Sequence, residues 1–248
     1  MERNKRFFVE DLADESIGLS VGEAHHAMHV MRLGAGDSVE LFDGHGGAAD
    51  GIIIEARHGK VSVGVVSRRQ PMVRPGPLIH LAFAVPKGKR LDWLLEKVTE
   101  LAVGSLTPVG FERSVVDPGE LVGAKRERWI GHCVSAAKQS GLAWLPELHN
   151  SRAMGDFLAW FARSGQIGLV GSAEGDVGSV KDALASIVTA PASEICLLVG
   201  PEGGLAASEY AAAGAAGFAP VRLGRTTLRI ETAAIALTAA TIAVLDER

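Results

Sequence analysis

The stretch LLVGPEGG, residues Leu197–Gly204, places an apolar run directly before a turn that contains three glycines. A short apolar run next to glycines is typical of a strand that is buried on both faces of a parallel sheet. Ligands of open parallel sheets bind beyond the carboxyl ends of the strands, and glycine lets a ligand approach the backbone closely. The turn is neither a Walker A loop nor a GxGxxG loop, so it does not specifically indicate a phosphate site. It predicts either a ligand site or only a tight connection to the next helix.

A second unusual stretch, LGRTTLRIETA, covers residues 223–233 and precedes an apolar segment with helical character. Its threonines and Glu231 have an ordinary explanation as residues that cap the start of that helix. Arg229 and Glu231 have an equally ordinary explanation as a surface ion pair of little energetic value. Both the structural and the functional interpretation of this stretch remain open from the residues alone.

The residues around these two stretches alternate between expected strands and expected helices. Leu78–Val85 is an almost continuous apolar run, followed by a helix at 90–103 whose apolar residues fall on one stripe and for which Gly104 suits the stop. Further helices are expected at 123–140, 208–216 and 232–246, and further strands at 167–170, 195–199 and 220–222. This alternation predicts an α/β fold with a parallel sheet.

The N-terminal part has a different pattern. Short β-type runs at 38–42, 51–55 and 60–67 are separated by glycine-rich turns, which suggests a small β-barrel. The segment Pro71–Pro77 cannot form a central strand or a helix, and we interpret it as a linker. The sequence therefore predicts two domains, a barrel at 1–72 and an α/β domain at 73–248.

The composition excludes several classes of protein. Of 248 residues 47% are hydrophobic and 22% charged, which is typical of a globular enzyme and not of a disordered chain. The net charge of −4 argues against coating of nucleic acid by bulk charge, although basic clusters occur at 3–6, 68–74 and 87–90. The longest apolar run, 233–245, is too short to span a bilayer, and the N-terminus has no hydrophobic signal core. We expect a cytoplasmic protein.

Other features of the sequence resemble functional sites but have ordinary structural explanations. His25, His26 and His29 have helical spacing but no accompanying HExxH pattern or cysteine ligands, so no metal site is expected. Asp43–Gly47 reads as a hairpin turn, and Ser140 lacks the GxSxG context of a hydrolase nucleophile. Cys133 and Cys196 lie far apart and are expected to be small buried residues.

An ordered set of strings covers nearly the whole chain: PKGKRLDWLLEKVTELAV at 86–103, AAKQS at 136–140, LLVGPEGG at 197–204 and LGRTTLRIETA at 223–233. Arg113, Arg128-Trp129 and the N-terminal residues Arg6-Phe7-Phe8, His26, Val30-Met31-Arg32 and Leu41–Gly44 fit the same pattern. This set resembles the 16S ribosomal RNA uridine-N3 methyltransferases of the SPOUT superfamily. GPEGG alone is moderately specific, because related RNA methyltransferases share a similar turn, whereas the ordered combination is strong.

The resemblance implies a PUA-like RNA-binding barrel followed by a SPOUT domain with a deep trefoil knot, which nothing in the periodicity indicates. It also implies S-adenosylmethionine as the methyl donor and a homodimer with the catalytic cleft at the subunit interface. By that similarity the cofactor-binding residues are Leu198, Gly200, Gly203, Gly204, Leu223, Gly224 and Leu228.

The chemistry of this reaction suggests roles for three charged residues. N3 of uridine is a poor nucleophile until its proton leaves, so a cation near O2 or O4 would stabilise the developing charge. Arg229 is the first candidate for that cation and Arg113 the second. Glu231 either accepts the proton, directly or through water, or only orients Arg229. We expect RNA contacts from Arg6, Arg32, Lys87 and Gln139.

The chain departs from the family pattern at four places. Leu205 and Ala206 stand where an aromatic residue and a Ser or Thr cap are usual, with Glu209 in the expected place. Gly141-Leu142 replaces a common Arg, Ile230 replaces a Thr, and Ala102 replaces a Gly.

Two alternative functions stay open: a SPOUT methyltransferase for another position, such as a ribose 2′-O in rRNA or tRNA, and a non-catalytic RNA-binding factor of ribosome assembly.

Overall fold

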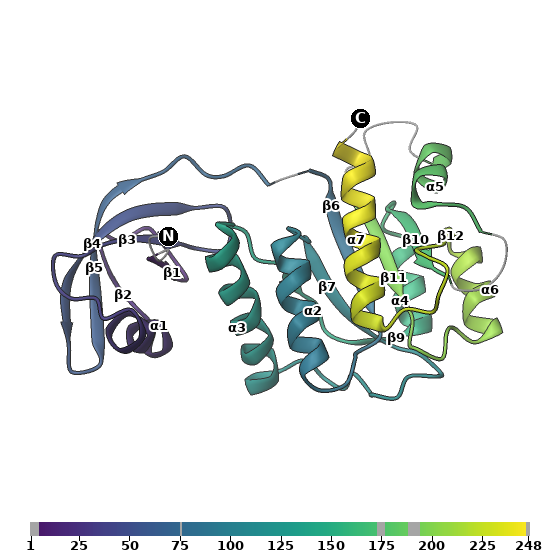
Figure 1. Ribbon diagram of the computed structural model, residues 1–248, viewed down its shortest axis with the longest axis horizontal. Coiled ribbons are helices and arrows are strands. Elements are labelled where there is room, and N and C mark those ends of the chain that lie inside the picture. Colours follow the sequence, from purple (N-terminus) through teal and green to yellow (C-terminus); the bar gives the residue numbers. More distant parts are fainter. Residues whose placement is uncertain (1–4, 75, 173–176, 188–193, 247–248) are drawn as a thin grey trace. The chain divides into compact units, whose positions relative to one another are not determined.

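The computed structural model describes residues 5–74, 76–172, 177–187 and 194–246 (Figure 1). The chain divides into two compact units. The first contains the described residues up to Arg74 together with Val134–Leu145, and the second contains the remainder. The boundary that the sequence predicts, after residue 72, lies in the same linker. The sequence analysis had placed residues 134–145 in the second domain, whereas the structure groups them with the first unit.

The first unit is a five-stranded sheet with one helical segment. Its strands have the order β1-β3-β4-β5-β2, with β1 parallel to β3 and the other neighbours antiparallel. A short helix α1 continues into a π-helical turn η1. The elements are β1 (Arg6–Phe8), β2 (Ser16–Gly18), α1 (Val21–His25), η1 (His26–Val30), β3 (Ser38–Phe42), β4 (Ala48–Arg57) and β5 (Lys60–Arg68). The three strands expected at 38–42, 51–55 and 60–67 are confirmed.

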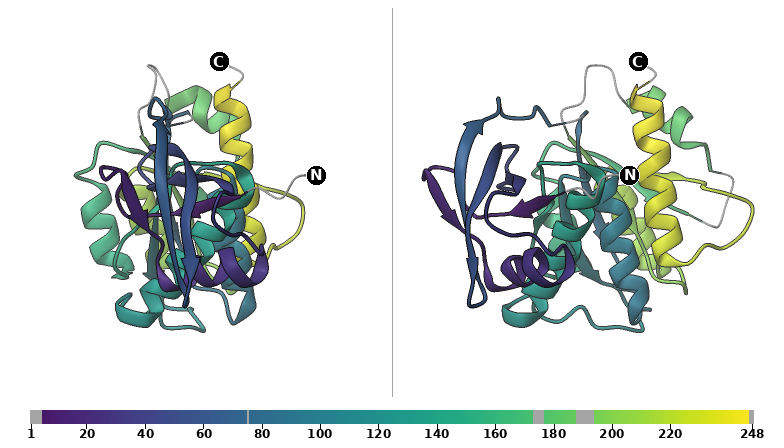
Figure 2. Two further views of the ribbon diagram at one scale, coloured as in Figure 1. Left: turned by 90° about the vertical axis from the view of Figure 1, so that its left-hand side faces the viewer. Right: turned by 60° about the vertical axis from the view of Figure 1, so that its left-hand side comes forward.

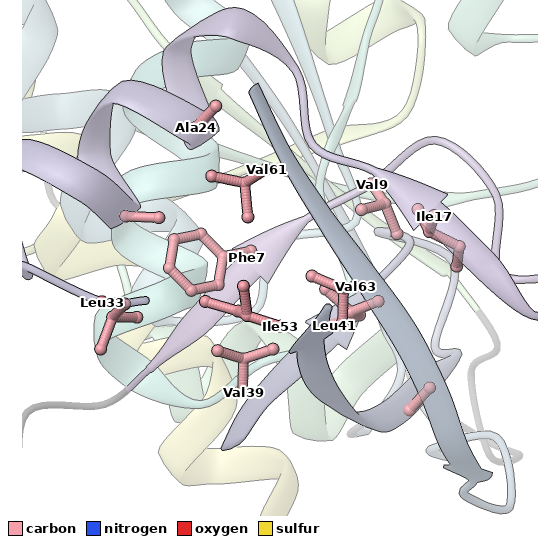
Figure 3. Packing of buried hydrophobic residues seen from close by; sticks show 12 residues of the cluster. Phe7, Val9, Ile17, Ala24, Leu33, Val39, Leu41, Ile53, Val61 and Val63 are labelled. Atoms are coloured by element: carbon pink, nitrogen blue, oxygen red, sulfur yellow. The ribbon is translucent and has the colours of Figure 1, made fainter. Parts of the chain in front are cut away.

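The core of this unit follows from the alternation of the strands. In β5, Val61 and Val63 are buried while the alternating residues Ser62 and Gly64 are not, as expected when one face of a sheet is covered. Figure 3 shows these valines among residues from the other strands and from the helical segment. Each fully buried side chain of this size contributes about 1.5–3 kcal/mol through the hydrophobic effect. This cluster holds the first unit together.

The turn between β3 and β4 binds the segment 134–145. The carboxylate of Asp43 accepts hydrogen bonds from the backbone N–H groups of His45 and Gly47, at 2.7 and 2.9 Å, which fixes the turn. Gly46 N then donates to Ala143 O, and Leu145 N donates to Gly44 O, each at 2.9 Å. The predicted hairpin turn is therefore confirmed, and it also attaches a segment that lies far away in the sequence.

The second unit is built on a seven-stranded sheet with the order β12-β10-β11-β6-β7-β8, in which β9 pairs only with β7. Every strand pair is parallel, as the sequence predicts. The strands are β6 (Leu78–Phe83), β7 (Ser105–Gly110), β8 (Glu147–Leu148), β9 (Arg152–Ala153), β10 (Ile167–Gly171), β11 (Glu194–Val199) and β12 (Phe218–Val221). The helices are α2 (Lys89–Glu100), α4 (Met154–Phe161), α5 (Val180–Ile187), α6 (Ala207–Ala215) and α7 (Ile230–Asp246). Helix α3 (Gly123–Ser140) begins in this unit, and its residues from Val134 onwards belong to the first unit.

Helices cover the sheet. Helix α7 packs on β6 and β11 and lies beside α2, as Figures 1 and 2 both show, while α4 contacts β7 and β9. Helix α2 buries Leu91, Leu94, Leu95 and Val98, the stripe that the sequence predicts. No helix in the part of the chain that the structure describes is long and apolar enough to cross a membrane.

The end of α2 corrects one detail of the sequence analysis. Val103 N donates to Val98 O and Ala102 N to Thr99 O, at 3.1 and 2.8 Å, which closes the last turn of the helix. The residue in the left-handed region is Ala102, with a φ of 57°, and not Gly104. Gly104 is needed for another reason, because a Cβ at this position would lie 1.9 Å from Leu78 Cδ1.

Candidate functional site

Four loops of the second unit leave the carboxyl ends of parallel strands. They are residues 84–88 after β6, 111–122 after β7, 200–206 after β11 and 222–229 after β12. Because the strands are parallel, these loops lie at one edge of the sheet, where ligands of open α/β sheets bind. They contain both stretches that the sequence analysis singled out, so the fold brings the two stretches to the same edge.

The loop after β11 is a tight turn with an exposed surface. Gly204 N donates to Pro201 O at 2.9 Å, and Gly204 has a φ of 69°, a conformation that favours glycine. A Cβ on Gly200 would lie 2.3 Å from Leu205 Cδ1, so that glycine permits the turn to close. Gly203 and Gly204 are exposed, whereas Leu198 is fully buried within β11, between β10 and β6.

The loop after β12 has unused hydrogen-bonding groups. Within the described residues, no backbone N–H of residues 223–228 donates a hydrogen bond. Leu223 and Leu228 are half-buried, and Gly224 is exposed. Leu223 Cδ1 would lie 3.7 Å from a Cβ on Gly171, which places this loop near the end of β10. Free N–H groups beside apolar side chains suit a ligand with both polar and apolar parts.

Arg90 connects two of the loops through carboxylates. Its Nη1 lies 3.0 Å from Glu202 Oε1, in the glycine-rich turn, and 3.9 Å from Glu231 Oε2, at the start of α7. Glu231 is buried, and its Oε2 accepts no hydrogen bond from the described residues. Arg229 is exposed, and its side chain pairs with no described residue. The ion pair between Arg229 and Glu231 that the sequence left open is therefore not present.

Arg113 lies at the glycine-rich turn. Its Nη1 donates to Gly203 O at 2.9 Å, and the neighbouring Glu112 N donates to Glu209 Oε1 at 2.8 Å. An arginine has five N–H donors, so the bond to Gly203 leaves most of the Arg113 guanidinium for a substrate. The sequence predicts a role for Arg113 but not the anchoring of its loop, and it indicates no role for Arg90 beyond its place in a basic cluster. No local sequence pattern predicts either contact, because the partners lie far away in the chain.

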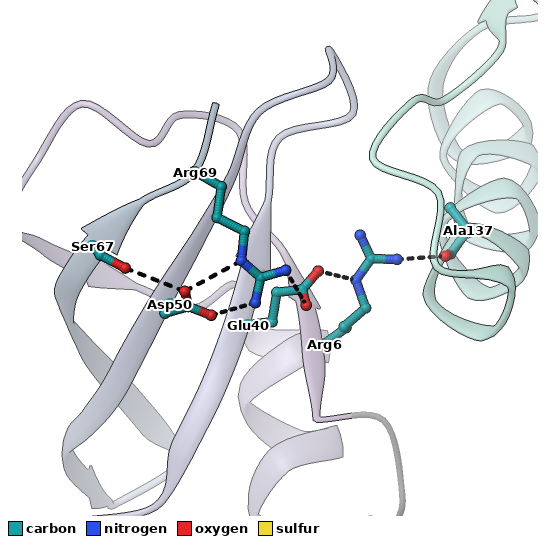
Figure 4. A network of polar contacts seen from close by, with 6 residues as sticks. All are labelled: Arg6, Glu40, Asp50, Ser67, Arg69 and Ala137. Carbon is teal, nitrogen blue, oxygen red and sulfur yellow. Dashed lines mark hydrogen bonds and ion pairs between the residues drawn. The ribbon is translucent and has the colours of Figure 1, made fainter. Parts of the chain in front are cut away.

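The residues predicted to bind RNA differ in exposure. Arg32 and Gln139 of the first unit and Lys87 of the second are exposed. Arg6 is 2% exposed, and Figure 4 shows its guanidinium between Glu40 and the carbonyl of Ala137, to which Nη1 donates at 2.9 Å. This position corrects our expectation for Arg6, because its donors are directed at protein groups and not at solvent.

The network around Arg6 continues across the sheet. Arg69 pairs with Glu40, at 2.9 Å, and with Asp50, which also accepts from Ser67 (Figure 4). The Arg69 guanidinium holds the pKa of Asp50 below its usual value. Burial lowers the pKa of Arg6, while Glu40 opposes that shift. Arg6 therefore stabilises the first unit and joins the end of α3 to the sheet.

The histidines and cysteines discussed above form no metal-binding cluster among the described residues. The rings of His25 and His29 are 4.7 Å apart between centroids, but no group of three candidate metal ligands occurs among the described residues. Cys133 and Cys196 are both buried, and burial raises the pKa of each thiol.

Family models match both units of the chain. The model described as an RNA methyltransferase domain matches residues 74–242, and the model described as an RNA methyltransferase PUA domain matches residues 19–66. The chain therefore belongs to the RNA methyltransferase family that these two models define, and its fold is a PUA-like domain joined to a SPOUT-type α/β domain.

Curated relatives carry one name, ribosomal RNA small subunit methyltransferase E. The relative from Mycobacterium tuberculosis is 31% identical over 98% of this chain and 92% of its own length. The relative from Synechocystis is 30% identical over 90% of this chain and 72% of its own length.

Solved structures agree with this assignment. A putative methyltransferase from Legionella pneumophila, in complex with S-adenosylmethionine, has a TM-score of 0.85 at 27% identity and covers 97% of this chain and 98% of its own. A ribosomal RNA small subunit methyltransferase E from Neisseria gonorrhoeae, bound to the same compound, has a TM-score of 0.81 at 27% identity and covers 95% of each chain.

Proposed function

We propose that this protein transfers a methyl group from S-adenosylmethionine to N3 of a uridine in the 16S RNA of the small ribosomal subunit. Family membership supports methyl transfer to RNA, and the name that the relatives share supports the small-subunit RNA. The observation that carries the proposal is the loop at 223–228, whose N–H groups have no partner among the described residues, at the edge where Arg113 and Arg229 are exposed.

The residues present fit the proposed cofactor. Its adenine and methionine parts need hydrogen bonds from backbone groups, and residues 223–228 supply unpaired N–H groups. A Cβ on Gly224 or Gly204 would meet no heavy atom within 4 Å, so the space beside both loops is open. Leu223 and Leu228 supply apolar contact. Both solved relatives with bound S-adenosylmethionine cover nearly all of this chain, which supports the same assignment.

The protein has two tasks in the reaction. The bound cofactor supplies an electrophilic methyl group on a sulfonium centre, so no further activation of the donor is required. The loops align the uridine N3 with that methyl group, and alignment alone can lower the barrier by several kcal/mol. Arg229 stabilises the negative charge that develops on the uracil carbonyls, and Arg113 assists from the glycine-rich turn.

Glu231 contributes to the reaction by positioning Arg90. Its carboxylate is buried and faces the guanidinium of Arg90, so it holds that side chain between the start of α7 and the glycine-rich turn. The N3 proton then leaves to water in the open site and not directly to Glu231. Uridine has to be turned out of its stack before N3 can reach this position.

We propose RNA contacts on each unit by itself, from Arg32 and Gln139 on the first and from Lys87 on the second, all of them exposed. Contacts of this kind to phosphates weaken as salt concentration rises.

We also propose a homodimer that acts in the cytoplasm; Trp93 on α2, 46% exposed, is an apolar side chain available to a second copy. The trefoil knot implied by the resemblance stays a prediction.

A transfer assay tests the proposal. Purified protein is incubated with labelled S-adenosylmethionine and, in separate reactions, with small ribosomal subunits, large ribosomal subunits or tRNA that lack the modification. We expect label in the RNA of the small subunit only. Label in tRNA or in the large subunit would discard the substrate, and tight cofactor binding without transfer to any RNA would favour a binding protein over an enzyme.

A further inference from the structure

One carboxylate joins the loop after β7 to the last residue of the loop that contains the glycine-rich turn. Glu209 Oε2 accepts a hydrogen bond from Ala206 N at 2.9 Å, and Glu209 Oε1 accepts one from Glu112 N at 2.8 Å. Ala206 directly precedes α6, whereas Glu112 lies 97 residues earlier in the loop after β7. Hydrogen bonds from N–H groups to an ionised carboxylate are stronger than those between neutral groups. The side chain of Glu209 therefore attaches the β7 loop to the start of α6.

The loop that Glu209 holds is itself a compact turn. Ser114 N donates to Phe111 O, and Phe111 N donates to Ser114 Oγ, both at 3.1 Å. Arg113 lies within this turn and reaches Gly203 O at 2.9 Å. Phe111 is buried at the start of this turn, and the polar contacts of its next two residues are Glu209 for Glu112 N and Gly203 for Arg113. A loss of the Glu209 contact moves Arg113 together with the turn.

Helix capping explains only half of this arrangement. A Glu at the third helical position commonly accepts from the N-cap N–H, as Glu209 does from Ala206. In a complete capping box the N-cap side chain also accepts from the helix, which the methyl group of Ala206 cannot do. The start of α6 does not require the second oxygen of Glu209. That oxygen is bound by Glu112 N, in the loop that carries Arg113.

We propose that Glu209 is a positioning residue for methyl transfer, which places Arg113 beside the glycine-rich turn by holding the backbone of Glu112. The proposal rests on the proposed function only in so far as Arg113 faces the uracil carbonyls. It predicts that the two roles of Glu209, capping of α6 and placement of the loop, can be separated by mutation.

The separation uses three variants. Glu209→Ala removes both contacts. Ala206→Ser with Glu209→Ala gives α6 a new side-chain cap but leaves Glu112 N without its acceptor. Ala206→Ser alone is the matched control, because it adds the cap and keeps the loop contact. The measurements are Tm, kcat and KM for small subunits, and hydrogen exchange of the Glu112 amide by NMR or by mass spectrometry of a peptide that contains it.

We expect Glu209→Ala to lower Tm and to lower kcat about 10- to 100-fold, because a displacement of about 1 Å costs up to that much. The double variant should recover Tm but neither kcat nor the slow exchange of the Glu112 amide. Arg113→Ala should add little to Glu209→Ala, since Arg113 is already displaced. If the double variant recovers kcat and slow exchange together with Tm, Glu209 is only a cap and the proposal is wrong.

The exchange measurement keeps this result separate from the fate of the proposed function. If the wild-type protein methylates no ribosomal RNA, the proposed function fails, while faster exchange at Glu112 in both Glu209→Ala backgrounds still supports the placement of the loop. If exchange at Glu112 is unchanged in those backgrounds, the positioning role is overturned even when methyl transfer is observed.

Discussion

The guanidinium of Arg90 lies 3.9 Å from the buried carboxylate of Glu231, although the two residues are far apart in the sequence. The same guanidinium lies 3.0 Å from Glu202, so one cation lies between a carboxylate of the glycine-rich turn and a carboxylate of α7. Without it, like charges would face each other at the edge of the sheet. The partner of Glu231 is therefore Arg90 and not the neighbouring Arg229. Arg90 in turn holds the glycine-rich turn beside the start of α7.

Arg90→Ala should therefore disturb the site without unfolding the protein. We expect kcat for methyl transfer to fall by about 10-fold or more, because the glycine-rich turn and the start of α7 lose their common partner. Arg90→Lys keeps the charge and should recover part of the loss. Lys97→Ala, which removes a surface contact with Glu96 and Glu100 on the same helix, is the control and should leave kcat unchanged. Equal kcat in Arg90→Ala and wild type would contradict the assignment.

Arg229→Ala tests the proposed stabilisation of charge on the uracil. The side chain is exposed and pairs with no residue in the part of the chain that the structure describes, so its loss should not weaken the fold. We expect kcat to fall by about 10²–10³-fold, as for the loss of one oxyanion-stabilising donor, with little change in the affinity for S-adenosylmethionine measured by calorimetry. Arg163→Ala, another exposed arginine, is the matched control. A loss of cofactor affinity with unchanged turnover would refute this role.

Arg6→Ala should act on stability. The substitution removes a buried cation that pairs with Glu40 and donates to Ala137. We expect the free energy of unfolding to fall by roughly 2–4 kcal/mol, near the range for a broken buried ion pair and reduced because Glu40 keeps Arg69. Arg69→Ala, which removes a half-exposed partner of the same Glu40, should cost less than about 1 kcal/mol. Denaturant titration compares the two. A stable Arg6→Ala variant that has lost only RNA affinity would restore the original expectation for Arg6.

His80 predicts how stability depends on pH. The ring is 3% exposed, bonded to the hydroxyls of Ser105 and Thr107 and stacked near Trp160 and His149. Burial lowers the pKa of His80 from its ordinary 6.5 to about 3, because the neutral ring is the form that the fold accommodates. Stability is therefore complete above the unfolded pKa and is lost as the pH falls from about 6.5 towards 3.

Between pH 7 and pH 5 this one group should cost about 2 kcal/mol of stability. His80→Asn does not titrate in this range and retains a polar group for Ser105. Its free energy of unfolding should be lower at pH 7 but should change less between pH 7 and pH 5, by about the same 2 kcal/mol. Parallel pH profiles for the two proteins would show that His80 is not the group responsible.

Ala102→Gly should stabilise the protein. Ala102 has a φ of 57° at the end of α2, which a side chain disfavours, and it is only half-buried. Relief of that strain exceeds the greater entropy of glycine in the unfolded chain, and we expect a gain of about 0.5–1 kcal/mol. Ala211→Gly, at an exposed position inside α6, should have the opposite sign and cost up to about 1 kcal/mol. A destabilised Ala102→Gly variant would contradict the interpretation of the turn.

The sequence predicts most of the second unit because its elements have strong local patterns. The apolar stripe of α2 and the buried strands β10 and β11 were expected within a few residues of where they lie. Helix α4 was not expected: it is eight residues long, begins after Ala153 without a side-chain cap and contains Gly155 near its start. Short uncapped helices are stabilised by packing, which a local pattern does not record.

Contacts between distant segments limit what the sequence reveals about the site. The free N–H groups of residues 223–228 and the anchoring of Arg113 depend on which loops the sheet brings together. Arg6 belongs to a basic cluster, from which the sequence predicts an exposed side chain, whereas the structure buries it. Its burial follows from Glu40 and Ala137, neither of which is its neighbour in the sequence.

Identification of the methylated nucleoside decides whether this protein methylates N3 of uridine. Small subunits that lack the modification are treated with this protein and labelled S-adenosylmethionine, and their RNA is digested to nucleosides for chromatography and mass spectrometry. The account predicts that the label appears in 3-methyluridine. Label in a 2′-O-methylated nucleoside or in another base would contradict it, and so would the absence of label when the protein is saturated with the cofactor.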